Sequence, residues 1–243
     1  ISQSKIPDEI IVVDDGSTDN TVNILKKKIY ENLQSSDFNF KLIEINHSGP
    51  GEARNVGIKK SNYDWISFLD SDDLWEKNKI ETMSKIIKLN KNYNFFCHNE
   101  KVINGQKILF NYYNNKYNKN FSFIKQLYLR NLFSTSAIIC KKKLFFDNGF
   151  FRKDLSSAQD YEMWLRLSPH INPYFINKVL GTYIIRKDNI TNSNFFTNYK
   201  NEIKITFLHF DKGNFFLFLL KILRISTIFL IKLYKKNNYF KTN

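Results

Sequence analysis

Three carboxylates stand together at the end of an apolar run. Asp70, Asp72 and Asp73 directly follow residues 65–69, with only Ser71 between them. Such a run predicts a buried strand, so the carboxylates would emerge at one edge of a sheet. Carboxylate oxygens are ligands that Mg²⁺ and Mn²⁺ prefer, and these ions also bind phosphate groups. Taken alone, the cluster leaves two interpretations open: a cation site that binds a phosphorylated ligand, or a solvated acidic turn.

A second carboxylate pair, Asp14 and Asp15, ends another apolar run, residues 10–13. The uninterrupted apolar pattern is typical of a strand that is buried on both faces. The following residues, 16–19, read Gly-Ser-Thr-Asp, which predicts a turn with a helix N-cap. This pair therefore has its own structural alternative, a cap for the next helix.

The elements around these carboxylates alternate between strands and helices. We expect strands at residues 9–14, 41–45, 64–69, 134–140 and 179–185, and helices at 51–60, 80–87 and 156–167. Short loops between alternating elements predict an α/β fold, Rossmann-like, with a mostly parallel sheet and helices on both faces. In such sheets ligands bind beyond the carboxyl ends of the strands. Both carboxylate groups would lie on that rim.

Composition narrows the range of partners. The chain has 243 residues and a formal net charge of +14. Residues 1–75 carry a net charge of −5, residues 76–197 of +12 and residues 198–243 of +7. The basic remainder favours anionic partners such as nucleotide phosphates or an anionic membrane surface. No nucleic-acid-binding motif is present and the acidic cluster would repel phosphate without a metal, so we do not expect a nucleic-acid partner.

The C-terminal segment, residues 215–234, is strongly apolar but interrupted by cations. At 100° per residue, Lys221, Arg224, Lys232 and Lys235 fall within a sector of about 80°. Cations near its middle argue against a membrane-spanning helix. The pattern predicts a basic amphipathic helix that lies in a membrane interface, and a core or oligomer-interface helix is the alternative.

Four motifs occur in an order that resembles the family 2 glycosyltransferases of bacterial surface polysaccharide synthesis. The motifs are Val-Val-Asp-Asp-Gly-Ser-Thr-Asp at 12–19, Gly-Glu-Ala-Arg-Asn-Val-Gly at 51–57, Phe-Leu-Asp-Ser-Asp-Asp at 68–73 and Gln-Asp-Tyr-Glu-Met-Trp-Leu-Arg at 159–166. The resemblance covers residues 8–191 and implies the GT-A fold. It also implies transfer of a sugar from a nucleotide-sugar donor, with inversion at the anomeric carbon.

The resemblance assigns the nucleotide-binding residues. Asp14 and Asp15 would contact the base or ribose, and a carboxylate, which only accepts hydrogen bonds, suits the imide N–H of uracil and so favours a UDP-sugar. Arg54 and Asn55 would line the nucleotide pocket, where Arg54 would pair with a phosphate or with the acidic cluster.

The same resemblance assigns the metal and catalytic residues. Asp72 would bind Mn²⁺ or Mg²⁺, and Asp70 would contact the ribose or a metal-bound water. Asp160 would be the base that takes the proton of the acceptor hydroxyl, and the alternative is a helix N-terminal charge. Trp164 would pack beneath Asp160, and Trp164 and Arg166 would contribute to substrate binding.

These expectations define two domains, a GT-A domain at residues 1–195 and a basic amphipathic helical segment at 196–243. The family's first strand has no counterpart before Ile1 in this sequence, so we expect an N-terminal strand to be missing. The expected enzyme acts on a glycan or a lipid-linked glycan, is cytoplasmic, and lies peripherally on the inner face of the cytoplasmic membrane. The alternative function is a catalytically impaired fragment or a scaffold subunit of a polysaccharide synthesis complex.

Overall fold

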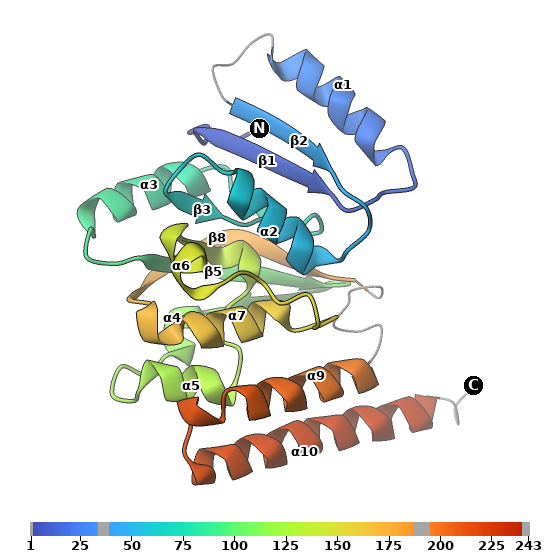
Figure 1. Ribbon diagram of the computed structural model, residues 1–243, viewed down its shortest axis with the longest axis vertical. Coiled ribbons are helices and arrows are strands. Elements are labelled where there is room, and N and C mark those ends of the chain that lie inside the picture. The colour runs from blue at the N-terminus through green and yellow to red at the C-terminus, as the bar shows by residue number, and fades with distance from the viewer. Residues whose placement is uncertain (1, 34–38, 187–194, 240–243) are drawn as a thin grey trace.

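The computed structural model describes residues 2–33, 39–186 and 195–239 (Figure 1). Its first part is a parallel β-α-β unit. Strand β1 (Glu9–Asp14) pairs with β2 (Asn39–Glu44), and helix α1 (Thr21–Leu33) lies between them in sequence. Helix α2 (Pro50–Lys60) packs on β1. The registered pairing of Asp14 with Glu44 places the carboxyl ends of both strands at one edge.

The second part is a sheet of six strands in the order β3-β7-β5-β8-β4, with β6 paired to β5. The strands are β3 (Trp65–Ser67), β4 (Leu74–Trp75), β5 (Phe95–Asn104), β6 (Lys107–Asn111), β7 (Ile138–Lys141) and β8 (Pro173–Ile185). The helices around it are α3 (Lys79–Leu89), α4 (Tyr113–Lys116), α5 (Phe123–Leu129), α6 (Lys143–Asn148) and α7 (Gln159–Leu167). Short 3-10 turns are η1 (Thr135–Ala137), η2 (Ser168–His170) and η3 (Phe210–Lys212).

The expectation of a mostly parallel sheet is wrong in this second part. Strands β5 and β8 are parallel, whereas the pairs β3–β7, β5–β7, β5–β6 and β4–β8 are antiparallel. The reason is local: the strand–helix alternation stops after α3, and the chain then reverses in a tight β5–β6 turn. Gly105 has φ +58° in this turn, a left-handed conformation that glycine adopts without strain.

Helices cover both faces of the second sheet, as the sequence predicted. Alternate side chains of β5 point to opposite faces. Phe95 and Cys97 belong to a large core with residues of α5, α6 and α7, whereas Phe96 belongs to a smaller core with Met83 of α3. The α/β class is therefore confirmed, with a mixed sheet in place of a parallel one.

The C-terminal segment forms two helices that lie side by side at one end of the molecule, α9 (Phe195–Leu208) and α10 (Phe215–Tyr239) (Figure 1). Helix α10 also packs on α5. Among the described residues, none of the helices combines the length and the apolar character needed to cross a bilayer. The predicted domain boundary at residues 195 and 196 falls at the start of α9, directly after residues that the structure does not describe.

One of the α10 cations, Lys221, departs from the predicted solvent-facing stripe. Lys221 is fully buried; its ammonium donates to the Tyr161 hydroxyl at 2.7 Å and lies 4.6 Å from the centre of the Tyr128 ring. Arg224 donates to the carbonyl of Leu129 at 2.7 Å. Lys235 lies outside the described side chains. Lys221 points inward because α5 and α7 offer hydroxyl and aromatic partners there, whereas Arg224 and Lys232 are exposed.

The outward face of α10 is apolar instead. Eight large hydrophobic side chains that are at least 40 % exposed lie on α10 between its first turn and its described end. They are Phe215, Phe216, Leu219, Leu220, Leu223, Leu230, Ile231 and Tyr234. We call this set the α10 apolar face.

Candidate active site

The acidic cluster is a tight turn between β3 and β4. The amide of Asp73 donates to the carbonyl of Asp70 at 3.1 Å, which closes the turn. The amide of Asp70 donates to the Ser136 hydroxyl at 3.0 Å, so η1 holds the turn from the neighbouring strand. Strand β3 ends at Ser67, three residues before Asp70, which lets the carboxylates leave the sheet.

The carboxylates of this turn divide into one anchor and two accessible groups. Asp73 is buried and accepts the amide of Ile184 at 3.2 Å, and burial raises its pKa to about 6. Asp70 and Asp72 are half-buried. In the part of the chain that the structure describes, the Asp72 carboxylate has no hydrogen-bond or ion-pair partner. A half-exposed, unpaired carboxylate is available to an incoming cation.

Arg54 connects α2 to the acidic turn. Its guanidinium pairs with the Asp70 carboxylate at 2.6 Å and lies 5.5 Å from the centre of the Phe151 ring. Pairing with the acidic cluster was one of two partners that the resemblance implied for Arg54, and it is the one that the structure contains. A guanidinium binds phosphate with the same bidentate geometry as a carboxylate, so this pair is exchangeable for a diphosphate.

Asp160 lies in the first turn of α7, within electrostatic range of Arg54 and Asp70. Burial raises the pKa of its carboxyl, the field of Arg54 lowers it and the field of Asp70 raises it. Asn131 donates its amide to Asp160 Oδ2 at 3.1 Å. Arg54 therefore pairs with Asp70 and lies within electrostatic range of Asp160, and the three residues come from three separate elements.

The entry to α7 has unusual backbone geometry. Ala158, the helix N-cap, has φ +57° and is the one non-glycine residue with positive φ in the described ranges. The following residue, Gln159, packs so closely on α2 that a Cβ added to Gly51 would lie 2.9 Å from its Oε1. This close contact holds the N-terminus of α7, and hence Asp160, against the N-terminus of α2.

Asp14 and Asp15 lie at the carboxyl end of β1 but satisfy backbone amides. Asp14 accepts the amide of Ser17 at 3.0 Å. Asp15 accepts the amides of Ser48 and Gly49 at 2.7 and 2.8 Å. Asp14 also lines an open hollow of about 520 Å³ between β1, β2 and α1, together with Gly16, Ser17, Val22, Glu44, Ile45 and Asn46.

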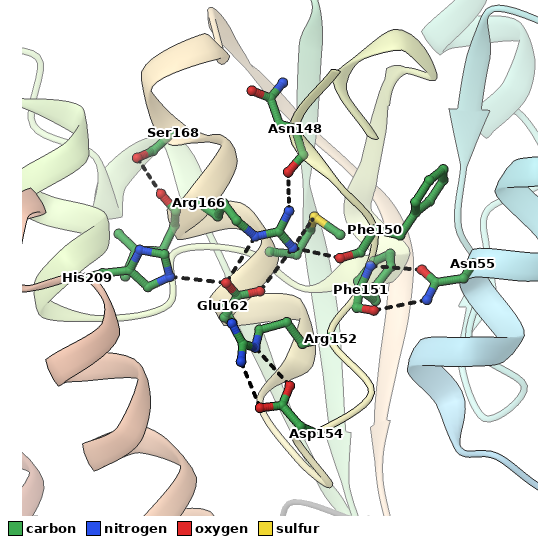
Figure 2. Close-up of polar contacts among 12 residues, drawn as sticks. Asn55, Asn148, Phe150, Phe151, Arg152, Asp154, Glu162, Arg166, Ser168 and His209 are labelled. Atoms are coloured by element: carbon green, nitrogen blue, oxygen red, sulfur yellow. Dashed lines mark hydrogen bonds and ion pairs between the residues drawn. The ribbon is translucent and has the colours of Figure 1, made fainter. Parts of the chain in front are cut away.

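Two residues expected in substrate binding, Asn55 and Arg166, make structural contacts here, and their role toward a substrate stays a prediction. The buried Asn55 amide bonds both backbone groups of Phe151, at 2.9 and 2.8 Å (Figure 2). Arg166 pairs with Glu162 at 3.0 Å and donates to the carbonyls of Asn148 and Phe150 (Figure 2).

Trp164, which was expected to pack beneath Asp160 and to bind substrate, lies in the core, and its role in substrate binding stays a prediction. It is fully buried among Phe68, Phe95, Phe145 and Phe151, with ring centres 5.5 to 6.4 Å from its own. Residues four apart share one face of a helix, and this face of α7 runs from the half-buried Asp160 into the large core.

Sequence reasoning missed Ser136 and Asn131. Ser136 holds the acidic turn through its hydroxyl, and its carbonyl accepts Trp75 Nε1 at 3.0 Å and Lys79 Nζ at 2.8 Å. Both missed residues lie in irregular segments, where no periodicity marks a position. Ser136 contacts the Asp70 backbone amide and Asn131 the Asp160 carboxylate across 66 and 29 residues of sequence, so only the fold reveals these contacts.

The chemistry of the acidic turn fits a Mg²⁺ or Mn²⁺ ion bound together with a phosphorylated ligand. In the described residues no group of three or more His, Cys, Asp or Glu side chains could hold a metal by itself. Mg²⁺ sites for phosphates need only one or two protein carboxylates, since the phosphates and waters complete the shell. Asp72 and Asp70 supply that number.

Sequence comparison connects the chain to known proteins. The family described as Glycosyl transferase family 2 matches residues 1–150. An "Uncharacterized glycosyltransferase" of Haemophilus influenzae is 30 % identical over 187 residues, which are 71 % of this chain and 56 % of that protein. The "UDP-Glc:alpha-D-GlcNAc-diphosphoundecaprenol beta-1,3-glucosyltransferase WfgD" of Escherichia coli is 36 % identical over 102 residues, 42 % of this chain and 37 % of that protein. The chain thus spans about half or less of these relatives.

Structural comparison identifies the fold. S. aureus TarS 1–349 in complex with UDP-GlcNAc superposes with a TM-score of 0.66 and 24 % sequence identity, covering 84 % of this chain and 59 % of that one. This likeness shows the GT-A fold that the sequence predicted. With the family match over more than half of its residues, the chain belongs to glycosyl transferase family 2.

Proposed function

We propose that the chain is the catalytic part of an inverting glycosyltransferase. It moves a sugar from a nucleoside diphosphate sugar, for which UDP is favoured, to a hydroxyl of a growing cell-surface glycan. The observation that carries the proposal is the convergence of Arg54, Asp70 and Asp160 beside the unpaired Asp72. A diphosphate clamp and a base are the two devices that inverting sugar transfer needs.

In this mechanism Asp160 accepts the proton of the acceptor hydroxyl. The acceptor oxygen forms a bond to the anomeric carbon while the bond from that carbon to the diphosphate oxygen breaks, and the nucleoside diphosphate leaves. Mn²⁺ or Mg²⁺ held by Asp72, with Asp70 beside it, would supply charge neutralisation for the diphosphate. Arg54 exchanges Asp70 for a diphosphate oxygen, because phosphate is an equally good partner for its guanidinium.

The hollow beside Asp14 is the proposed nucleoside site. Its lining contains the Asp14 carboxylate and Asn46, which offer hydrogen-bond groups to a nucleoside. The UDP named in the S. aureus and E. coli relatives supports this choice of base. Asp15 has an indirect role in this proposal. Its carboxylate fixes the loop at residues 48–49, from which α2 begins.

Donor turnover in the full-length protein tests the mechanism. We expect Asp72→Asn and Asp160→Asn each to lower metal-dependent sugar transfer by about 100-fold or more. Asp147→Asn is the matched control, because Asp147 is an exposed carboxylate paired only with Lys143. Full transfer by Asp160→Asn would remove Asp160 from the mechanism. No transfer by the wild type would favour the alternative, an impaired or scaffold subunit.

We also propose peripheral binding to the inner face of the cytoplasmic membrane through the α10 apolar face. The structure adds an exposed apolar surface on α10, while Arg224 and Lys232 remain exposed and residues 198–243 carry a net charge of +7. Apolar contact together with positive charge favours an anionic lipid surface over a second copy of this chain, which would carry the same charge. A lipid-linked acceptor, as the E. coli relative's name specifies, would lie at that surface.

Vesicle flotation tests this placement. We expect the wild type to float with phosphatidylglycerol vesicles and less with neutral ones. Phe216→Glu with Leu223→Glu should abolish flotation, because both side chains are about two-thirds exposed on the α10 apolar face. Leu89→Glu, at an exposed position on α3, is the control and should float normally. Unchanged flotation of the double variant would exclude this face as the membrane contact.

A further inference from the structure

Asn131 approaches the candidate base from a segment that none of the four motifs includes. Its amide nitrogen donates to Asp160 Oδ2 at 3.1 Å. The orientation of this amide is set by its other end, because Asn131 Oδ1 accepts the backbone amide of Phe133 at 3.2 Å. A reversed amide would place oxygen against the carboxylate and nitrogen against an N–H, and both contacts would be repulsive.

The segment that carries Asn131 is fixed on both sides although Asn131 itself is exposed. After it, Leu132 and Phe133 are buried in the large core. Before it, the carbonyl of Tyr128 accepts the Tyr161 hydroxyl of α7 at 2.6 Å, and the carbonyl of Leu129 accepts Arg224 of α10 at 2.7 Å.

These contacts satisfy the last carbonyls of α5, which lack partners within the helix. One of them comes from Tyr161, the residue directly after Asp160. Two hydrogen bonds therefore join α7 to the segment at residues 128–131. Asn131 donates to the Asp160 carboxylate, and the Tyr161 hydroxyl donates to the Tyr128 carbonyl. A segment held in this way keeps its donor at one place with little loss of conformational entropy on binding substrate.

We propose that Asn131 is a positioning residue that holds the Asp160 carboxylate in the orientation from which it accepts the acceptor's proton. The inference rests on the proposed function. The contact leaves Asp160 Oδ1 free of Asn131, so one oxygen is held while the other faces the substrate. The other groups that act on Asp160 are Arg54 of α2, Asp70 of the acidic turn and the backbone amide of Tyr161.

Two substitutions separate positioning from simple support of the loop. Asn131→Asp keeps an Oδ1 that accepts the Phe133 amide, but replaces the donor with a second carboxylate that faces Asp160. Asn131→Ala removes both contacts. A supporting role predicts that the Asp variant behaves as wild type and that only the Ala variant is impaired. A positioning role predicts that both lose activity and that the Asp variant is at least as impaired.

The assay is sugar transfer by the full-length protein, with kcat, donor KM and the pH profile of kcat measured for each variant. We expect kcat to fall about 10-fold in both variants with little change in donor KM, because the donor is bound by other residues. The acid limb of the profile should move to higher pH, since a hydrogen bond to the ionised carboxyl is lost. Arg130→Ala, whose contact points to the Lys116 carbonyl, should leave that limb in place.

Wild-type kcat and an unmoved acid limb in Asn131→Asp would overturn the inference. Equal losses in kcat and donor KM with an unmoved limb would also overturn it, because that result describes a structural residue. Asp160→Asn is measured in parallel. If it retains full transfer, the proposed function fails; if it is inactive while the Asn131 variants are normal, only the present inference fails.

Discussion

Replacing the buried Lys221 with methionine should make the protein more stable at neutral pH. Lys221 is fully buried in the folded chain, and burial lowers its pKa from 10.5 to about 7. A folded pKa below the unfolded pKa means that the folded state resists protonation. Below pH 7 the buried lysine therefore lowers the free energy of unfolding by its full penalty. This penalty decreases as the pH rises from 7 and disappears towards pH 10.5.

The magnitude follows from the shift. One pKa unit corresponds to about 1.4 kcal/mol, so this shift sets an upper limit of roughly 5 kcal/mol on the penalty at low pH. The hydrogen bond to Tyr161 and the contacts with the Tyr128 and Tyr161 rings offset roughly 2 kcal/mol. Methionine removes both effects at nearly constant volume. We expect Lys221→Met to gain about 2–3 kcal/mol at pH 6.5, or about 4–6 °C in Tm.

Thermal unfolding between pH 6.5 and pH 9 measures this difference. The gap between Lys221→Met and wild type should shrink to within about 1 kcal/mol near pH 9, because the wild-type lysine is then neutral in the folded state. Lys232→Met is the matched control: it removes an exposed lysine from the same helix and should show no such pH dependence. A destabilised Lys221→Met whose gap to wild type stays constant from pH 6.5 to 9 would refute the reasoning.

Two further stability predictions concern the interior. Glu100 is buried against Tyr113 at 2.6 Å and burial raises its pKa to about 7, so its ionisation reduces stability above pH 7 and not below pH 4.5. Glu100→Gln should therefore raise the free energy of unfolding by about 1–2 kcal/mol at pH 8 and leave it nearly unchanged at pH 5. Urea unfolding at both pH values measures the difference, and equal effects at the two pH values would contradict the prediction. Gly51→Ala should destabilise by about 1–3 kcal/mol, because its Cβ would lie 2.9 Å from the buried Gln159 side chain. Gly57→Ala is the control in thermal unfolding, since its Cβ would meet nothing closer than 3.7 Å. An equal loss of stability in both variants would exclude the clash with Gln159 as the cause.

The sequence was sufficient for the elements that follow a regular period. The runs before Asp14 and Asp70 are strands, and residues 50–60 and 159–167 are helices, because apolar spacing and turn residues determine them locally. Strand direction was not accessible in the same way. The antiparallel pairs of β7 depend on a chain reversal through α5 and η1, and those segments carry no periodic signal.

The C-terminal helix marks a different limit. Spacing alone placed Lys221 and Arg224 on one stripe, and the structure retains that stripe. What spacing cannot supply is the direction in which the stripe faces. The hydroxyl of Tyr161 and the carbonyl of Leu129 decide it, and both lie far away in sequence. Amphipathicity therefore predicts two faces of a helix but not which one is buried when both cations and apolar groups have partners.

The motif at residues 159–166 combines one reactive group with the packing that positions it. Trp164 lies one helical turn after Asp160 and packs at 6.3 Å on Phe68, which lies two residues before Asp70. The two carboxylate elements of the site, from different ends of the sequence, are therefore joined through an aromatic contact in the core. Arg166 fixes the far end of the same helix to the loop at 148–150. Because packed cores deform little, this arrangement holds the proposed base at a constant separation from the proposed diphosphate site, as the proposed in-line transfer requires.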